Sequence, residues 1–171
     1  MTLDQLNTIM PNARAKAGIF LPALNATMVE FGINTSARQA SFVAQLAHES
    51  GQLLYVRELA SGAAYEGRKD LGNVLPGDGV RFRGRGLIQV TGRSNYAACG
   101  KALGLDLLAQ PALLEQTVNA CRSAGWFWQS RGLNALADAG DQVAVTRRIN
   151  GGTNGLTERL AYFKVAQKVL A

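Results

Sequence analysis

The chain has 171 residues, of which 47% are hydrophobic and 18% charged, a composition typical of one globular domain rather than of a disordered, collagen-like or coiled-coil protein. Its 18 basic and 12 acidic residues leave a formal charge of +6, which favours polyanionic partners such as nucleic acid, anionic lipid or an acidic cell wall. No apolar run approaches the ~20 residues of a membrane span, and the first residues lack the basic and apolar regions of a classical secretion signal.

The spacing of apolar residues predicts a mainly α-helical fold. We expect helices near residues 3–10, 13–31, 37–50, 93–103, 112–129, 132–138, 141–149 and 157–170. Thr2 and Ser36 each begin an S/T-x-x-Q pattern, the capping box that marks the start of a helix. Gly18 and Pro22 are points at which the second helix could be interrupted. Strand-like residues within 83–91 favour at most a small β-hairpin.

Two glycine-rich stretches, residues 61–92 and 150–155, separate the predicted helices. Irregular loops of this length inside a compact domain are usually functional, so we expect the site to involve them. From Gly79 to Leu105 there are five basic residues and no acidic one. This pattern fits either a solvated basic face or the lining of a cleft.

The cysteine and histidine content argues against a metal site. Cys99 and Cys121 lack the C-x-x-C spacing of a zinc or redox motif, and both lie in apolar helical patterns, so we expect buried free thiols. The chain has one histidine, His48, whereas an H-E-x-x-H zinc motif needs two. We interpret His48 as a structural hydrogen-bonding residue. We therefore expect neither a metal nor a cofactor.

Glu49 gives the sharpest local signal. On a helix over residues 37–50 it lies about 20° around the axis from Phe42, at the edge of the apolar face. A carboxyl group there is partly removed from water, which disfavours its charged form and suits a general acid. The alternative is an ordinary glutamate of the last helical turn, paired with an arginine.

A second carboxylate would complete a glycosidase site, and Glu58 is the nearest candidate. On an unbroken helix it would lie about 13.5 Å along the axis from Glu49 and half a turn around it, whereas inversion requires roughly 6.5–9.5 Å between the two groups. The pair therefore requires that the helix end between the two glutamates, and Gly51 is a residue at which it could end. Glu58 could instead be a structural partner of Arg57 or Arg85. Other acidic residues are rivals for the same role: Glu66, Asp70 and Asp78.

Three segments occur in one order along the chain: F-V-A-Q-L-A-H-E-S-G at 42–51, R-G-R-G-L-I-Q-V-T at 83–91 and I-N-G-G at 149–152. Together they resemble the family 19 glycoside hydrolases, which comprise plant-type chitinases and a branch of bacteriophage endolysins. The resemblance runs from about residue 36 to residue 160. The short chain without a signal is more similar to the endolysin branch. The interval from Glu49 to Glu58 is shorter than in plant chitinases, and residues 60–80 lack a clear match.

The resemblance implies a two-lobed, lysozyme-like α-helical fold with a central cleft, and inverting hydrolysis of β-1,4 bonds to N-acetylated amino sugars. It implies that Glu49 is the general acid, that Glu58 is the base that activates water, and that Thr91 helps to hold this water. N-capping of a helix is the competing interpretation of Thr91. The positions that resemble substrate-binding residues of the family are Gln89, Asn95, Asn150 and Arg159, the last near the acid. Gln89 and Asn150 could instead hold loops.

The resemblance favours a peptidoglycan-degrading endolysin, a muramidase that cuts between N-acetylmuramic acid and N-acetylglucosamine for host-cell lysis. We expect residues 1–171 to form a single catalytic domain, monomeric and without a separate wall-binding module. Made in the host cytoplasm, it would need a membrane-permeabilising partner such as a holin to reach the wall in the periplasm. Nucleic acid is not expected as a partner.

Three alternatives stay open at this point. The substrate could be chitin, or the enzyme could be a lytic transglycosylase, which needs only one carboxylic acid. A cationic protein that binds the wall or membrane without catalysis is the non-enzymatic alternative, with residues 157–171 as an amphipathic candidate element. A packed terminal helix is the favoured interpretation of that stretch. The aromatic run Trp126-Phe127-Trp128 is interpreted mostly as core.

Overall fold

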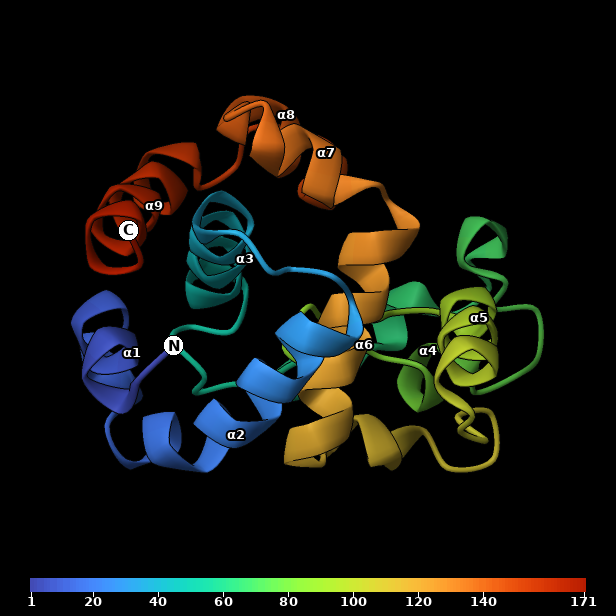
Figure 1. Ribbon diagram of the computed structural model, residues 1–171. Coiled ribbons are helices and arrows are strands. Elements are labelled where there is room, and N and C mark those ends of the chain that lie inside the picture. The colour runs from blue at the N-terminus through green and yellow to red at the C-terminus, as the bar shows by residue number, and fades with distance from the viewer.

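The computed structural model describes all residues, 1–171, and consists of helices and loops without a β-sheet (Figure 1). The α-helices are α1 Leu3–Ile9, α2 Ala15–Glu30, α3 Ser36–Glu49, α4 Asp78–Arg81, α5 Arg93–Leu103, α6 Thr117–Ser130, α7 Leu133–Asp138, α8 Gln142–Asn150 and α9 Leu156–Val169. Short 3-10 turns occupy Pro11–Ala13, Ala63–Tyr65, Lys69–Leu71 and Pro111–Glu115. None of the helices combines the length and the apolar character that crossing a membrane would require.

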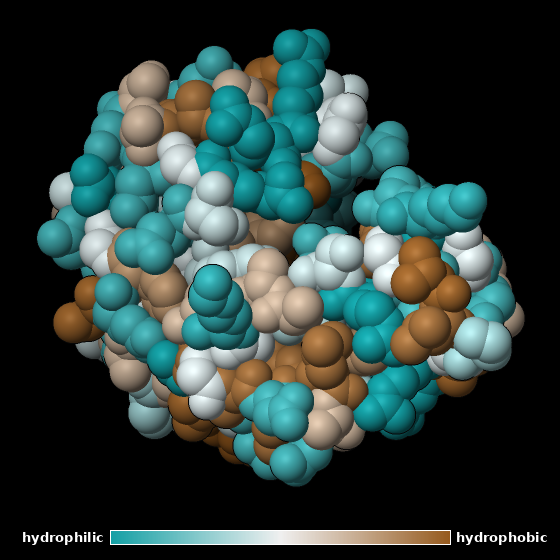
Figure 2. Space-filling model, turned by 90° about the vertical axis from the view of Figure 1, so that its right-hand side faces the viewer, coloured by the Kyte–Doolittle hydropathy of each residue, from teal (hydrophilic) through white to brown (hydrophobic).

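Helix α6 runs through the middle of the molecule and has a group of helices on either side (Figure 1). On one side, α3 packs against α9 and α1 packs against both α9 and α2, while α7 and α8 continue this group above them. On the other side lie α4, α5 and the glycine-rich loops. Helices α2 and α5 both pack against α6, which therefore joins the two groups. Seen from the side of α5, the surface is hollowed between raised parts of the molecule (Figure 2).

One hydrophobic core of 35 buried residues extends through both groups of helices. Trp128 of α6 is only 2% exposed and meets Phe42 of α3 edge-to-face, with ring centroids 5.3 Å apart. Cys99 and Cys121 are buried free thiols, and desolvation raises the pKa of each to about 12. The prediction of buried free thiols is confirmed.

The local signals of the sequence are confirmed at some helix ends and corrected at others. Thr2 forms the expected capping box with Gln5. The start of α3 differs, because Thr35, not Ser36, is the N-cap and accepts from the backbone N–H of Arg38. Helix α2 continues through Pro22 without interruption.

Two further elements differ from the prediction. The single helix expected over 112–129 is divided at Gln116, which adopts an extended conformation between a 3-10 turn and α6. The small hairpin expected over 83–91 is reduced to isolated bridges, in which Arg85 pairs with Val90 and with Arg57. Glycines in this segment favour tight turns over a regular ladder, so residues 83–91 lie as a folded loop against Arg57 and Glu58.

Candidate active site

Glu49 is the last residue of α3, and the backbone leaves the helical path directly after it. The hydroxyl of Ser50 donates to the carbonyl of Leu46 at 2.6 Å, and Gly51, Gln52 and Leu53 then follow with φ between 57° and 68°. Left-handed conformations are costly for residues other than glycine, so the neighbouring structure must hold them. The Gln52 side chain does so by accepting from the backbone of Asn12 and donating to Tyr162. The helix therefore ends between Glu49 and Glu58, as the two-carboxylate interpretation requires.

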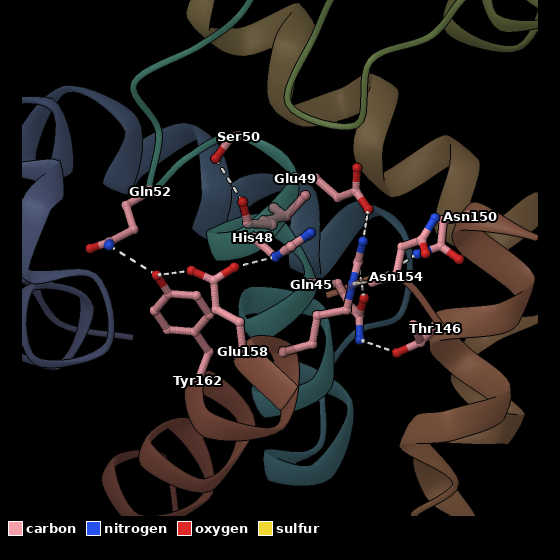
Figure 3. A network of polar contacts seen from close by, with 12 residues as sticks. Gln45, His48, Glu49, Ser50, Gln52, Thr146, Asn150, Asn154, Glu158 and Tyr162 are labelled. Atoms are coloured by element: carbon pink, nitrogen blue, oxygen red, sulfur yellow. Dashed lines mark hydrogen bonds and ion pairs between the residues drawn. The ribbon is translucent and has the colours of Figure 1, made fainter. Parts of the chain in front are cut away.

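Arg159 of α9 holds one oxygen of the Glu49 carboxylate (Figure 3). Its guanidinium donates to Glu49 Oε1 at 2.5 Å, to Gln45 Oε1 at 2.5 Å and to the Asn154 carbonyl at 3.2 Å. Gln45 in turn donates to the Thr146 hydroxyl. The arginine side chain is 3% exposed and the glutamate side chain 18%. Glu49 is thus oriented by three helices, while its other oxygen, Oε2, points away from the network in Figure 3.

Glu58 lies in the loop after α3 and is bound by neutral donors only. Tyr65 donates its hydroxyl to Glu58 Oε1 at 2.8 Å, and the backbone N–H of Gly84 donates to Oε2 at 3.0 Å. Burial, followed by the Glu58 carboxylate, raises the pKa of Tyr65, so the phenol remains a donor at neutral pH. The alternative of an ion pair with Arg57 or Arg85 is wrong, because Glu115 is the acidic partner of both arginines.

The rival carboxylates all have structural partners. The two oxygens of Glu66 accept from the backbone N–H groups of Gly77 and Gly79 at 2.7 and 2.8 Å. Asp70 pairs with Arg68 on the surface. Asp78 is buried and pairs with Arg93, whose hydrogen bonds are the main cause that lowers the pKa of Asp78 to about 2. Unlike Asp70 and Asp78, Glu58 pairs with no cation, and unlike Glu66 it accepts from only one backbone N–H, so it stays our candidate for the second carboxylate.

Gly84 is the point around which three predicted site residues meet. A Cβ at this position would lie 2.7 Å from Gln89 Oε1 and 3.3 Å from both Glu58 Oε2 and Thr91 Oγ1. Thr91 does not cap a helix, because Gly92 is the N-cap of α5 and the Thr91 hydroxyl donates to the Gln89 carbonyl at 2.9 Å. The lone pairs of that hydroxyl remain available to accept from a water molecule beside Glu58.

A hollow of about 120 Å³ extends this cluster towards α6. Its lining includes Gln89, Thr91 and Asn95 together with Trp126 and Phe127. The two amides are partly used inside the protein, since Gln89 donates to the Gly86 carbonyl and Asn95 to the Thr91 carbonyl. The core interpretation of the aromatic run holds fully for Trp128 alone, because the other two rings are half-buried and face this hollow. Consecutive positions on a helix point in different directions, so the sequence did not indicate which rings would face the hollow.

Asn150 and His48 both act within the protein (Figure 3). The Asn150 side chain donates to the Asn154 carbonyl and accepts from Gly152, and thereby holds the loop that reaches Arg159. His48 Nδ1 lies 2.5 Å from Glu158 Oε2, in agreement with the structural role expected for it.

Gln45, Asn154 and Tyr65 support the two glutamates without having been assigned a role from the sequence. The sequence does carry a signal for Gln45, because it lies four residues before Glu49 and therefore on the same face of α3. The loop residues Asn154 and Tyr65 have no comparable periodic signal.

Residues 26–169 match the family described as chitinase class I, glycoside hydrolase family 19. A family 19 domain-containing protein of Haemophilus influenzae is 31% identical over 92% of this chain and 91% of its own. An Arabidopsis thaliana endochitinase is 36% identical over 78% of this chain but only 46% of its own, so the chain spans about half the length of such plant relatives.

Solved structures agree with this match. Chitinase C of Streptomyces griseus superposes with a TM-score of 0.79 at 26% identity, over 99% of this chain and 76% of the other. A class IV chitinase of Zea mays gives a TM-score of 0.74 at 26% identity, over 96% and 90% of the two chains. The mainly α, lysozyme-like fold predicted from the sequence is thereby confirmed. The chain belongs to the family 19 glycoside hydrolases and is a glycoside hydrolase.

Proposed function

We propose that this glycoside hydrolase is a muramidase that cuts peptidoglycan between N-acetylmuramic acid and N-acetylglucosamine with inversion. The observation that carries the reaction type is the contrast between the two glutamates. Glu49 is oriented by Arg159 through one oxygen only, and Glu58 has no cationic partner and lies beside the Thr91 hydroxyl. Two carboxylates held in different environments suit the separate roles of acid and base.

In the proposed reaction, Glu49 protonates the glycosidic oxygen through Oε2, the oxygen not held by Arg159. Glu58 accepts a proton from a water molecule whose position is fixed by Thr91. That water attacks the anomeric carbon from the opposite face of the sugar as the glycosidic bond breaks, so the product has inverted configuration. Trp126 and Phe127 would stack on sugar rings along the hollow that Gln89 and Asn95 also line.

The positive charge supports peptidoglycan as the substrate. The chain carries a formal charge of +6, and an anionic wall polymer with carboxylate-bearing peptide stems is attracted to such a surface. Chitin is the second candidate, favoured by the relatives named as endochitinases and chitinases. A lytic transglycosylase would need no second carboxylate, whereas here Glu58 is held in place by two donors.

We further propose that the biological role is lysis of a bacterial host by a phage-type endolysin. The protein would act as a monomer, be made in the cytoplasm, and reach the wall with the help of a membrane-permeabilising partner such as a holin. The non-enzymatic alternative depends on a free amphipathic segment at residues 157–171. Against it, α9 is packed on α3 and contributes the buried Arg159 to the site.

Mass spectrometry of fragments released from Gram-negative peptidoglycan tests this proposal. The wild-type protein should release fragments that end in hydrated, reducible muramic acid, and Glu49→Gln and Glu58→Gln should each abolish this. Asp70→Asn is the matched control, because it removes an exposed carboxylate that pairs only with Arg68.

Each other outcome decides against one part of the proposal. Anhydro-muramic ends that persist in Glu58→Gln would identify a transglycosylase. Release of fragments from chitin oligomers but not from peptidoglycan would identify a chitinase. Killing of cells that survives Glu49→Gln would indicate membrane disruption separate from hydrolysis.

A further inference from the structure

A basic hollow of about 500 Å³ lies between the end of α6 and helix α8, outside the two-glutamate site. Arg131, Arg147 and Arg148 line it, and we call it the arginine hollow. None of the three forms an ion pair, and the same holds for Arg14, Arg81 and Arg83, whereas the remaining seven arginines each contact a carboxylate. The one acidic residue in its lining, Asp141, accepts from the backbone of Ala144 as the N-cap of α8.

Arg131 and Arg148 lie close together despite their like charge, and Arg147 lines the same hollow. Arg148 donates to the backbone carbonyl of Arg131 at 3.0 Å, and the Arg131 guanidinium lies 4.2 Å from the centre of the Phe127 ring. Burial, followed by the charge of Arg148, lowers the pKa of Arg131. A bound anion would relieve this repulsion, and the planar guanidinium fork matches a carboxylate in geometry.

The arginine hollow and the predicted sugar-binding region share one lining residue, Arg131. Arg131 also lines the smaller hollow that holds Gln89, Asn95 and the ring of Phe127. At its other end the lining reaches Ile149 and Gly151, on either side of Asn150. A glycan that occupies the smaller hollow would therefore lie beside Arg131, at the edge of the arginine hollow.

We propose that the arginine hollow binds the carboxylates of peptide stems on the glycan and so distinguishes peptidoglycan from neutral chitin. The inference rests on the proposed muramidase function and names the part of the substrate that the hollow recognises. Neither Arg147 nor Arg148 forms a hydrogen bond or ion pair with Glu49 or Glu58, so the role proposed for them is in substrate specificity and not in the chemical step.

Two charge-matched double variants test this role in hydrolysis. R147Q/R148Q removes two exposed charges from the hollow, and K164Q/K168Q removes two exposed charges from α9. On intact peptidoglycan, R147Q/R148Q should lose about tenfold in kcat/KM, mainly through KM, since charge-assisted hydrogen bonds are lost. On glycan strands from which an amidase has stripped the stems, both variants should match the wild type. R147K/R148K, which keeps the charge without the fork, should recover part of the loss.

Direct binding separates this inference from the proposed function. Calorimetry with Glu49→Gln measures the affinity for a soluble muramyl tripeptide and for the same compound with its carboxylates amidated. We expect binding of the acidic form, about tenfold weaker after R147Q/R148Q and unchanged after K164Q/K168Q, and weaker binding of the amidated form. Equal binding of both forms, or equal affinity with and without the two arginines, would overturn the inference.

The two proposals fail in different ways. If intact peptidoglycan is not cut but the tripeptide binds through Arg147 and Arg148, the muramidase function fails and the binding site stands. If peptidoglycan is cut equally well by the wild type and R147Q/R148Q, the muramidase function stands and the arginine hollow has no role in specificity.

Discussion

At the scale of single residues, the Thr91 hydroxyl is the group whose proposed role is easiest to isolate. It lies with Glu58 around Gly84, where a Cβ would be 3.3 Å from both Thr91 Oγ1 and Glu58 Oε2. Thr91→Val keeps the shape but removes the acceptor for water, so kcat should fall by about 10²-fold, within the range of acid–base assistance. Thr91→Ser keeps the hydroxyl and should retain most of the activity. Steady-state kinetics on the substrate identified by fragment analysis measures both.

Thr8→Val is the matched control for this change, because Thr8 lies on the exposed face of α1, where its hydroxyl donates only to the Asp4 carbonyl. It should leave kcat unchanged. A Thr91→Val protein with wild-type kcat would exclude the hydroxyl from the reaction and leave only its hydrogen bond to the Gln89 carbonyl as a structural role.

Asp78 provides a residue-scale prediction for stability in acid. Its buried carboxylate accepts two bonds from Arg93 and one from the backbone of Leu75, and these partners lower its pKa from 3.8 to about 2. The folded protein therefore binds this proton less tightly than the unfolded chain. The resulting stabilisation, about 2 kcal/mol, is complete above pH ~4 and is lost as the pH falls towards 2.

Urea unfolding at a series of pH values measures this contribution. Asp78→Asn should lower the free energy of unfolding at neutral pH by at least that amount, and the difference from the wild type should narrow between pH 4 and pH 2. Curves for the two proteins that stay parallel over this range would show that Asp78 does not titrate as its partners require.

At the scale of elements, the packing of α2 on α6 depends on a glycine. A Cβ at Gly125 of α6 would overlap the Phe31 ring and lie 2.6 Å from Thr27 Cγ2 on α2. Gly125→Ala should therefore destabilise the protein by about 1–3 kcal/mol through overpacking. Gly18 on the exposed face of α2 has no atom within 4 Å of such a Cβ, so Gly18→Ala should stabilise it by about 0.5–1 kcal/mol. Urea midpoints of the two variants measure these opposite shifts, and shifts of the same sign would contradict the packing argument.

Helices with an apolar stripe were predictable from the sequence, because their burial pattern repeats along the chain. Helices α5 and α7 begin and end within one residue of expectation. The one-turn helix α4 was not predicted, because four residues are too few for a periodic signal. The loop at 83–91 resembled a hairpin in its residue types, but its bonds to Val56 and Glu58, which depend on tertiary folding, decide its shape.

The site was predictable where residues are close in sequence or belong to a recognisable segment. The end of the helix after Glu49 was predictable from Gly51, and the contact of Arg159 with Glu49 was predictable from the family resemblance. The partners of Glu58 could not be predicted, because Tyr65 and Gly84 reach it from separate loops. The choice of Glu58 over Glu66, Asp70 and Asp78 as the proposed second carboxylate likewise depends on hydrogen-bond partners that the sequence does not show.

At the scale of the whole molecule, the two groups of helices on either side of α6 share one continuous core. Buried residues such as Leu6 and Ala166 belong to the same cluster as Tyr96 and Leu103 of α5. If one group of helices unfolded, apolar side chains of α6 and of the other group would become exposed to water. The two groups should therefore unfold together, in one cooperative transition.

Calorimetry tests this cooperativity. A single thermal transition is expected, with a ratio of calorimetric to van't Hoff enthalpy near 1 and a heat-capacity change of about 2 kcal/mol/K for a chain of 171 residues. Tryptophan fluorescence, which reports on Trp126 and Trp128 in α6, should change at the same temperature as the far-ultraviolet circular dichroism of all helices. Gly125→Ala weakens the contact of α2 with α6, so it should lower the midpoint while keeping one transition. Two transitions in the wild type would mean that the helices on either side of α6 are independent folding units, because a shared core does not allow one side to unfold alone.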